Sequence, residues 1–295
     1  MRAVFFNVGN SVRSGWKLLG YFLLTALFVG GSIFLRRMLP DGVRPFVSEP
    51  LLAFLGALLA TRVCTRLERT SLAAAGFSPT GPIWRDLGLG LLGGAAAVLL
   101  VAVGVWLLDG LHLVRAPEGT VSGLLRGAWT MLVASLFEET VFRGYAFQRA
   151  VQGMGARWAQ VLFAVLFTLA HPFPPEMEGS VMALAMLNTF MAGWVFGLCY
   201  LRTGHLALPV GAHWGWNWVL GSLGFGVSGN DSKGWWTPVF HGKPTWLTGG
   251  DYGLEASVVT AGVLVLILVG LTRWKGHKTV IAPVPLTPPI IATGL

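Results

Sequence analysis

The sequence predicts an all-α membrane protein, a polytopic bundle of about eight transmembrane helices. Of its 295 residues, 54% are hydrophobic and only 12% are charged, whereas soluble domains carry roughly 25% charged residues. Mean hydropathy is +0.66, and apolar runs that approach or reach the ~20 residues needed to cross a bilayer recur along the chain. The net charge is +8, but in a membrane protein the positions of Lys and Arg relative to the spans indicate topology. We therefore do not interpret the charge as a sign of nucleic-acid binding, and we expect the lipid bilayer as a partner.

The first part, residues 1–120, is expected to hold three spans and their connectors. These spans are 16–35, 51–63 and 84–108. The first is too long for a signal-peptide core and ends in Arg36 and Arg37, so we expect it to be retained. Cys64 and Cys199 give neither a disulfide framework nor a metal-ligand spacing.

The second part, residues 121–225, is expected to hold a catalytic core of four spans. We predict one long helix over 123–150, followed by spans at 157–171, 182–201 and 206–223. The third part, residues 226–295, is expected to contain an outer loop, a last span at 254–274 and a disordered, proline-rich tail.

The distribution of basic residues predicts that both termini lie in the cytoplasm. With eight spans in that orientation, most of the 21 Lys and Arg fall on the cytoplasmic side, as the positive-inside rule requires. Arg36 and Arg37 lie on the outer side in this arrangement and argue locally against it.

The stretch from Ser135 to Gly144 places charged residues inside an apolar segment. A charge at the bilayer centre costs at least ~3 kcal/mol, so such residues usually mark a functional site. Glu139 and Arg143 are four residues apart and share one helix face, within pairing distance. Glu138 is rotated by about 100° from Glu139, which leaves it available. The pattern fits either a buried structural ion network or one structural acid beside one working acid.

Two later spans also carry polar residues at helical spacing. Phe167 and His171 are four apart before Pro172, and His213 and Asn217 are four apart in the seventh span. Each His can simply bond backbone or a neighbouring helix. Together with Glu138, however, the set suits activation of water, in which Glu takes the proton, a His orients the water and His or Asn donates to an oxyanion.

These three motifs, in this order on membrane spans, resemble those of the CPBP family of CAAX-processing and bacteriocin-processing intramembrane proteases. The motifs are Glu138-Glu139-x-x-x-Arg143, Phe167-x-x-x-His171 and His213-x-x-x-Asn217. The resemblance covers about 123–223. It implies an eight-helix bundle with a cavity open towards the cytoplasm and peptide-bond hydrolysis as the activity. It also suggests an integral protein of a bacterial cytoplasmic membrane.

The resemblance also implies roles for the motif residues. Glu138 would act as general base with His171, and His213 and Asn217 would stabilise the oxyanion. Glu139, Arg143 and Phe167 would support the site. We commit to no cofactor, although Glu138, His171 and His213 could supply three zinc ligands. No His-Glu-x-x-His helix is present in the sequence, and a Glu that ligates zinc is not free to act as base, so we favour glutamate-activated water.

Two other functions remain open from the sequence. A membrane scaffold or immunity protein could share the fold, but it has no need of an unpaired intramembrane Glu. A proton-coupled transporter could use Glu138 and the two His as a relay, but the halves show no matching broken helices. The expected partner is a membrane-associated or lipid-modified peptide or protein.

Overall fold

The computed structural model describes residues 12–78, 82–177 and 179–277. The proline-rich tail predicted for the C-terminus lies outside the described residues. The elements are α2 (Ser14–Arg37), η1 (Arg44–Phe46), α3 (Glu49–Leu67), η2 (Leu72–Ala75), α4 (Ile83–Leu107), β1 (Leu111–Arg115), α5 (Val121–Arg143), α6 (Tyr145–Met154), α7 (Ala156–Leu169), α8 (Gly179–Thr203), α9 (Ala207–Ser222), β2 (Trp236–Phe240), α10 (Thr245–Thr248), η3 (Gly250–Tyr252), η4 (Leu254–Ala256) and α11 (Val258–Arg273).

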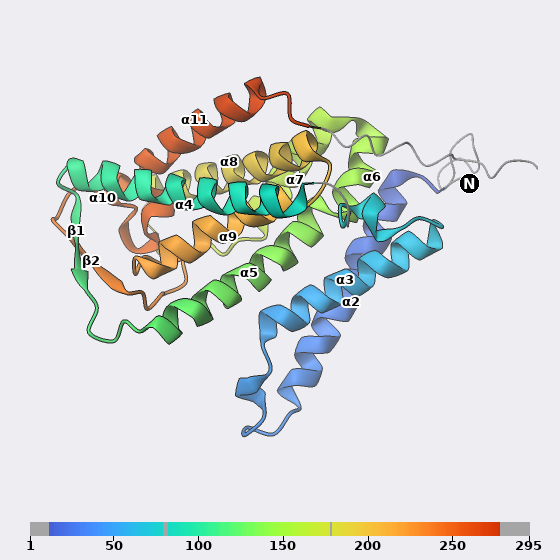
Figure 1. Cartoon of the computed structure of the whole chain (residues 1–295), viewed down its shortest axis with the longest axis horizontal. Coiled ribbons are helices and arrows are strands. Elements are labelled where there is room, and N and C mark those ends of the chain that lie inside the picture. The colour runs from blue at the N-terminus through green and yellow to red at the C-terminus, as the bar shows by residue number, and fades with distance from the viewer. Residues whose placement is uncertain (1–11, 79–81, 178, 278–295) are drawn as a thin grey trace, which may run out of the picture.

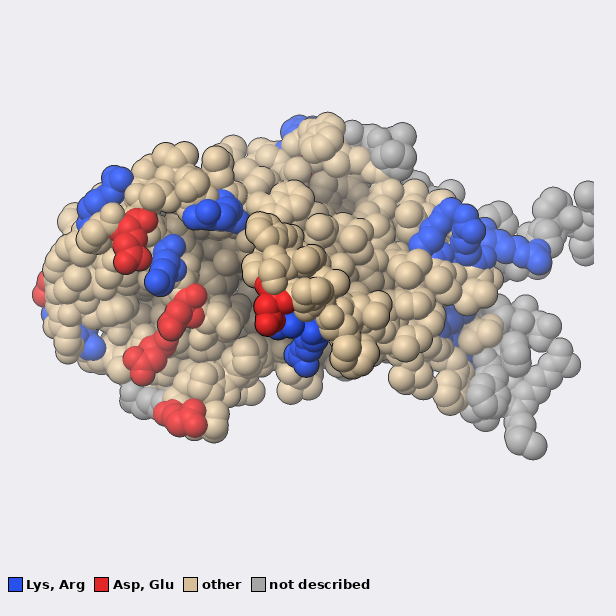
Figure 2. All heavy atoms as spheres, turned by 90° about the horizontal axis from the view of Figure 1, so that it is seen from below, with Lys and Arg blue, Asp and Glu red and all other residues tan. Residues whose placement is uncertain are grey.

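The fold is a helical membrane bundle, as the sequence predicts. By length and composition, α2, α3, α4 and α8 can each cross a membrane, and α7 and α11 are shorter apolar helices. Large apolar side chains such as Leu23, Leu92 and Leu266 are exposed on the outside of these helices. Figure 2 shows one face on which charged side chains are few and stand in small groups separated by broad uncharged surface. Such a surface suits contact with lipid.

The helices α4, α5, α7, α8 and α9 form the body of the bundle, and α11 packs mainly against α8 (Figure 1). The antiparallel pair α2 and α3 leans away from this body and joins it through α5 and α6. Helix starts follow local chemistry. For example, the Thr120 side chain accepts a hydrogen bond from Gly123 N at the start of α5, which satisfies one of the free donors of the first turn.

Glycines bring α4 and α9 into close contact. A Cβ added at Gly211 would collide with the carbonyl oxygen of Leu87, and one at Gly215 with that of Leu91. In a membrane, small residues let two helix backbones approach and gain van der Waals contact. This interface therefore fixes the helix that carries His213.

The prediction of one continuous helix over 123–150 is wrong. The helix breaks at Gly144, where ψ is −133°, so that α5 ends at Arg143 and α6 begins at Tyr145. A Cβ at Gly144 would collide with the carbonyl oxygen of Thr140, so only glycine fits this turn. Helix α6 ends before Gly155, whose φ is +82°, a conformation that glycine adopts without strain.

The segments between the predicted spans 84–108 and 123–150, and between 206–223 and 254–274, contain a strand pair that the sequence did not predict. Strands β1 and β2 run antiparallel, with Leu111 opposite Phe240 and Arg115 opposite Trp236. The Arg115 guanidinium lies over the Trp235 ring, 4.7 Å from its centroid. The pair joins the end of α4 to the segment that precedes α10, at one end of the bundle (Figure 1).

Candidate active site

The polar centre of the site is the carboxylate of Glu139 on α5. Its Oε1 accepts hydrogen bonds from Arg143 Nη1 at 3.2 Å and from His213 Nδ1 at 2.9 Å. Arg143 Nη2 also donates to the carbonyl oxygen of Gly193 on α8, at 2.8 Å. Glu139 and Arg143 are both fully buried, so each charge depends on the other for compensation.

Aromatic rings enclose this charged group. The Arg143 guanidinium lies 4.5 Å from the centroid of the Phe167 ring and 5.3 Å from that of Phe196. The Phe196 ring stacks on His213 with centroids 4.7 Å apart, and the Phe167 ring lies 4.5 Å from that of His171. Cation–π attraction helps to stabilise the buried guanidinium, and the rings restrict how the two imidazoles can turn.

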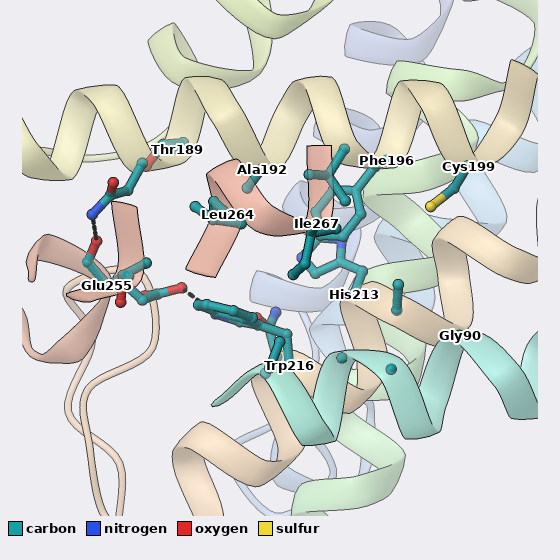
Figure 3. Close-up of a pocket in the computed structure, with 18 of the residues that line it drawn as sticks. Gly90, Thr189, Ala192, Phe196, Cys199, His213, Trp216, Glu255, Leu264 and Ile267 are labelled. Carbon is teal, nitrogen blue, oxygen red and sulfur yellow. Dashed lines mark hydrogen bonds between the residues drawn. The ribbon is translucent and has the colours of Figure 1, made fainter. Parts of the chain in front are cut away.

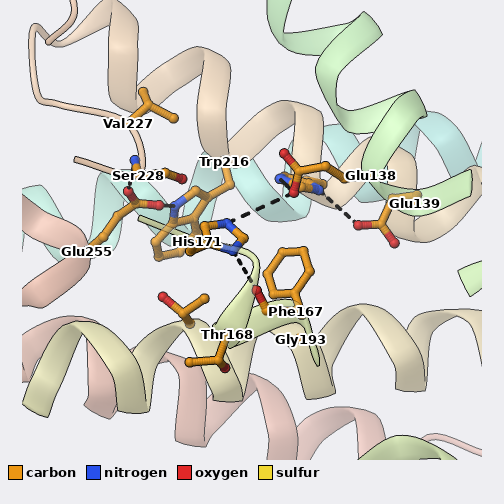
Figure 4. Close-up of polar contacts among 12 residues, drawn as sticks. Glu138, Glu139, Phe167, Thr168, His171, Gly193, Trp216, Val227, Ser228 and Glu255 are labelled. Atoms are coloured by element: carbon orange, nitrogen blue, oxygen red, sulfur yellow. Dashed lines mark hydrogen bonds and ion pairs between the residues drawn. The ribbon is translucent and has the colours of Figure 1, made fainter. Parts of the chain in front are cut away.

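Glu138 is placed differently from its neighbour. Its side chain retains 25% exposure, and Oε2 is buried with no hydrogen-bond partner within the described residues. This oxygen lies 4.0 Å from His171 Nε2 and 3.9 Å from His213 Nε2. The structure thus brings together residues from α5, from the end of α7 and from α9 (Figure 4).

The hydrogen bonds of the two imidazoles determine which nitrogen faces Glu138. His171 Nδ1 donates to the carbonyl oxygen of Phe167 at 2.7 Å, and His213 Nδ1 donates to the Glu139 carboxylate. Because neither acceptor can donate, both Nδ1 atoms carry the proton. In the neutral rings, both Nε2 lone pairs therefore point towards Glu138. Separations near 4 Å leave room for a water molecule that donates one hydrogen to Glu138 Oε2 and the other to an Nε2 atom.

The site opens onto a cavity of about 330 Å³, lined mainly by apolar side chains. His171, His213 and Asn217 line it, together with the α4 glycines and residues of α8 and α11. Figure 3 shows its length along α8, with Thr189 and Glu255 at one end and Cys199 at the other. Asn217 is buried one helical turn after His213, on the same side of α9.

Three residues of this region were missed by the sequence reasoning. Phe196 packs on His213. Trp216 Nε1 donates to Glu255 Oε1 at 3.0 Å, and both residues line the cavity. Glu255 falls within the predicted span 254–274, where a lone acid in an apolar run was a usable signal. Phe196 and Trp216 gave no such signal, because aromatic residues are common in membrane helices.

The geometry tests whether Glu138, His171 and His213 could hold zinc. Their donor types are suitable, but a tetrahedral zinc with bonds of about 2 Å holds its donors about 3.3 Å apart. Here Glu138 Oε2 lies 4.0 Å from His171 Nε2 and 3.9 Å from His213 Nε2. The donor atoms in this structure therefore lie farther apart than the ligands of a bound zinc ion.

Comparison with known proteins agrees with the motifs. Residues 120–219 match a family model described as Rce1-like, type II CAAX prenyl endopeptidase Rce1-like. The matched range contains the three motifs, from Glu138 to Asn217. No curated protein matches the chain. The match confirms the family resemblance that the motifs indicate.

Proposed function

We propose, from the membership of residues 120–219 in the Rce1-like family of type II CAAX prenyl endopeptidases, that this protein hydrolyses a peptide bond through water activated by Glu138. The family is one of peptidases that act at membranes. The substrate we propose is a membrane-associated or lipid-modified peptide or protein, because the cavity wall is largely apolar and can accept a hydrophobic segment.

The observation that carries the proposal is the unpartnered Glu138 oxygen. Glu138 Oε2 is buried without a hydrogen bond within the described residues, beside the Nε2 atoms of His171 and His213. A buried acceptor without a partner costs about 1–3 kcal/mol, and catalytic sites are where such costs are tolerated. A water molecule between Glu138, His171 and His213 would satisfy the oxygen and stand ready to react.

The reaction follows from these positions. Glu138 removes a proton from the water as its oxygen attacks the carbonyl carbon of the scissile bond, while His171 Nε2 accepts the second hydrogen and orients the attack. The negative charge moves to the carbonyl oxygen, where the Asn217 amide donates a hydrogen bond. Glu138 then gives its proton to the leaving nitrogen, the C–N bond breaks, and a carboxylic acid and an amine are released.

His213 contributes through its charge. Its Nε2 can donate to the oxyanion only when the ring is doubly protonated, and the Glu139 carboxylate at 2.9 Å from Nδ1 stabilises that form. Arg143 balances Glu139 in turn. The pair therefore supports the site without touching the substrate.

Two further proposals concern placement. We propose that the protein is integral to a bacterial cytoplasmic membrane, with both termini in the cytoplasm, because the basic residues follow that orientation. We also propose that residues 121–225 form the catalytic core, flanked by the N-terminal helices and by the last span with its outer loop.

The test is cleavage of a panel of membrane-anchored peptides by the purified protein. The wild type should cut at least one peptide, and His171→Ala and His213→Ala should each lower the rate by roughly 10²-fold or more. Full activity in both variants would show that the site assignment is wrong. Absence of cleavage, with the same partner bound by wild type and variants, would favour a scaffold.

A further inference from the structure

One end of the cavity is lined by hydrogen-bond acceptors that the proposed reaction does not use. Figure 4 shows Glu255 and Glu138 on opposite sides of His171. Glu255, in the turn η4 that precedes α11, is an acid facing a cavity whose other walls are mainly apolar. It belongs to none of the family motifs.

Two N–H groups donate to the Glu255 carboxylate, one from an indole ring and one from the backbone. Its Oε1 accepts from Trp216 Nε1 at 3.0 Å, and its Oε2 accepts from Ser228 N at 2.5 Å. No Lys, Arg or His of the described residues lies within 4.0 Å of its oxygens.

Two neighbouring groups at this end of the cavity are buried acceptors without partners. Asn188 donates through Nδ2 to the carbonyl oxygens of Glu255 and Ser257, at 2.8 and 2.9 Å. These bonds fix its amide orientation, and its Oδ1 has no partner within the described residues. The Tyr252 hydroxyl is buried near Thr189 but makes no hydrogen bond of normal length and angle there. All of these side chains line the cavity.

We propose that this end of the cavity, formed by Glu255, Asn188 and Tyr252, binds a cationic nitrogen of the substrate, an ammonium or a guanidinium group. This rests on the proposed peptidase function, for which it specifies the substrate class. The basic group of the substrate would lie on the side of His171 opposite Glu138. It would therefore be held at a fixed distance from the scissile bond.

The chemistry favours a cation over a neutral group. An ammonium offers three donors and a guanidinium five, and neither has an acceptor. The site offers a carboxylate, a free amide oxygen and a hydroxyl oxygen. A buried acid without a charged partner is costly, and a cation that supplies both charge and donors removes that cost. An apolar substrate side chain would leave all three oxygens unsatisfied.

A binding experiment tests the site without relying on cleavage. The probes are butylguanidinium and its neutral isostere butylurea, titrated into the detergent-purified protein by calorimetry and by thermal shift. We expect butylguanidinium to bind more tightly, and Glu255→Gln to weaken it by about 10-fold or more. Equal affinity for both probes, or an unchanged guanidinium affinity in Glu255→Gln, would overturn the proposal.

A second variant guards against a folding defect in Glu255→Gln. Tyr252→Phe removes only a hydroxyl that makes no hydrogen bond of normal length and angle within the described residues, so the fold should persist while cation affinity falls by about threefold. Tyr200→Phe is the matched control, because its hydroxyl is also buried without a partner but Tyr200 does not line the cavity. Equal effects from the two variants would contradict a site at Tyr252.

Peptide pairs then identify the source of the cation. Each cleaved peptide is compared with one in which Lys or Arg is replaced by norleucine, and with one whose N-terminus is acetylated. If only the norleucine replacement lowers the cleavage rate, the site binds a side chain. If only the acetylation lowers it, the site binds the terminal amine. If neither change lowers the rate, the cation is not part of the substrate and the proposal fails. Probe binding without cleavage of any peptide would count against the peptidase and not against the cation site.

Discussion

His213 Nδ1 lies 2.9 Å from Glu139 Oε1, and this contact gives the two adjacent acids of α5 different tasks. Glu139 holds two partners through one oxygen, since Oε1 also accepts from Arg143, while its Oε2 has no partner within the described residues. Glu138, one residue earlier, has a free oxygen that faces the Nε2 atoms of His171 and His213. One acid therefore orients the imidazole and balances the guanidinium, and the other is left to react.

Removing Glu139 should destabilise the fold. In Glu139→Ala the buried Arg143 guanidinium loses the one carboxylate that pairs with it among the described residues, and breaking a buried pair in this way costs about 3–5 kcal/mol. Thermal and denaturant unfolding in detergent would measure the loss. Glu139→Gln keeps an acceptor oxygen and should lose less. Equal stability of Glu139→Ala and the wild type would contradict a structural role for this acid.

The sequence predicted the part of the site that local spacing controls. Glu139 and Arg143 pair because residues four apart share a helix face, and the same rule linked Phe167 with His171 and His213 with Asn217. The bond from Glu139 to His213 joins residues 74 positions apart. Spacing along one helix cannot reveal such a contact, because it depends on how α5 and α9 pack together.

The fold shows the same limit. Apolar runs predicted each long helix, but not the break at Gly144, which depends on a close approach between its backbone and Thr140 O. The pair of β1 and β2 joins Leu111 to Phe240, which are far apart in the sequence. Neither segment is apolar and alternating enough to identify it as a strand, so only the folded chain reveals the pairing.

Close packing of α4 on α9 gives a prediction about glycines. Gly215→Ala should destabilise the protein by about 1–3 kcal/mol, because its Cβ would collide with Leu91 O. Gly88→Ala is the matched control on α4, where no atom lies within 4 Å of the added Cβ and alanine favours the helix. The unfolding midpoint of Gly215→Ala should fall clearly below that of the wild type, and the midpoint of Gly88→Ala should not. Similar midpoints would contradict close packing at this interface.

The turn between α8 and α9 gives a prediction about pH. Burial lowers the pKa of His205, and the nearby Asp86 only partly offsets this. In the unfolded chain this His takes up a proton near its usual pKa of about 6.5. In the folded protein it takes up the proton only at lower pH, so the free energy of unfolding decreases as pH falls from about 7 to 5. Unfolding midpoints across this range should decline less steeply in His205→Gln. Equal slopes would show that another group controls the acid sensitivity.

The width of the Glu138 site gives a prediction about metals. Donor separations of 3.9 and 4.0 Å do not suit zinc, so dialysis against a chelator should leave the cleavage rate unchanged. Loss of activity on chelation, followed by recovery with zinc, would show that the donors close around a metal and would overturn the metal-free reaction.

The rate of cleavage by Glu138→Gln tests the central claim most directly. The substitution keeps the size of the side chain but removes the base, and a positioned general base contributes about 10²–10⁴-fold to the rate. Because Glu138 Oε2 makes no hydrogen bond within the described residues, the unfolding midpoint should stay near that of the wild type. We expect a folded protein whose single-turnover cleavage rate falls by this factor. A folded Glu138→Gln protein that cleaves at the wild-type rate would contradict the account.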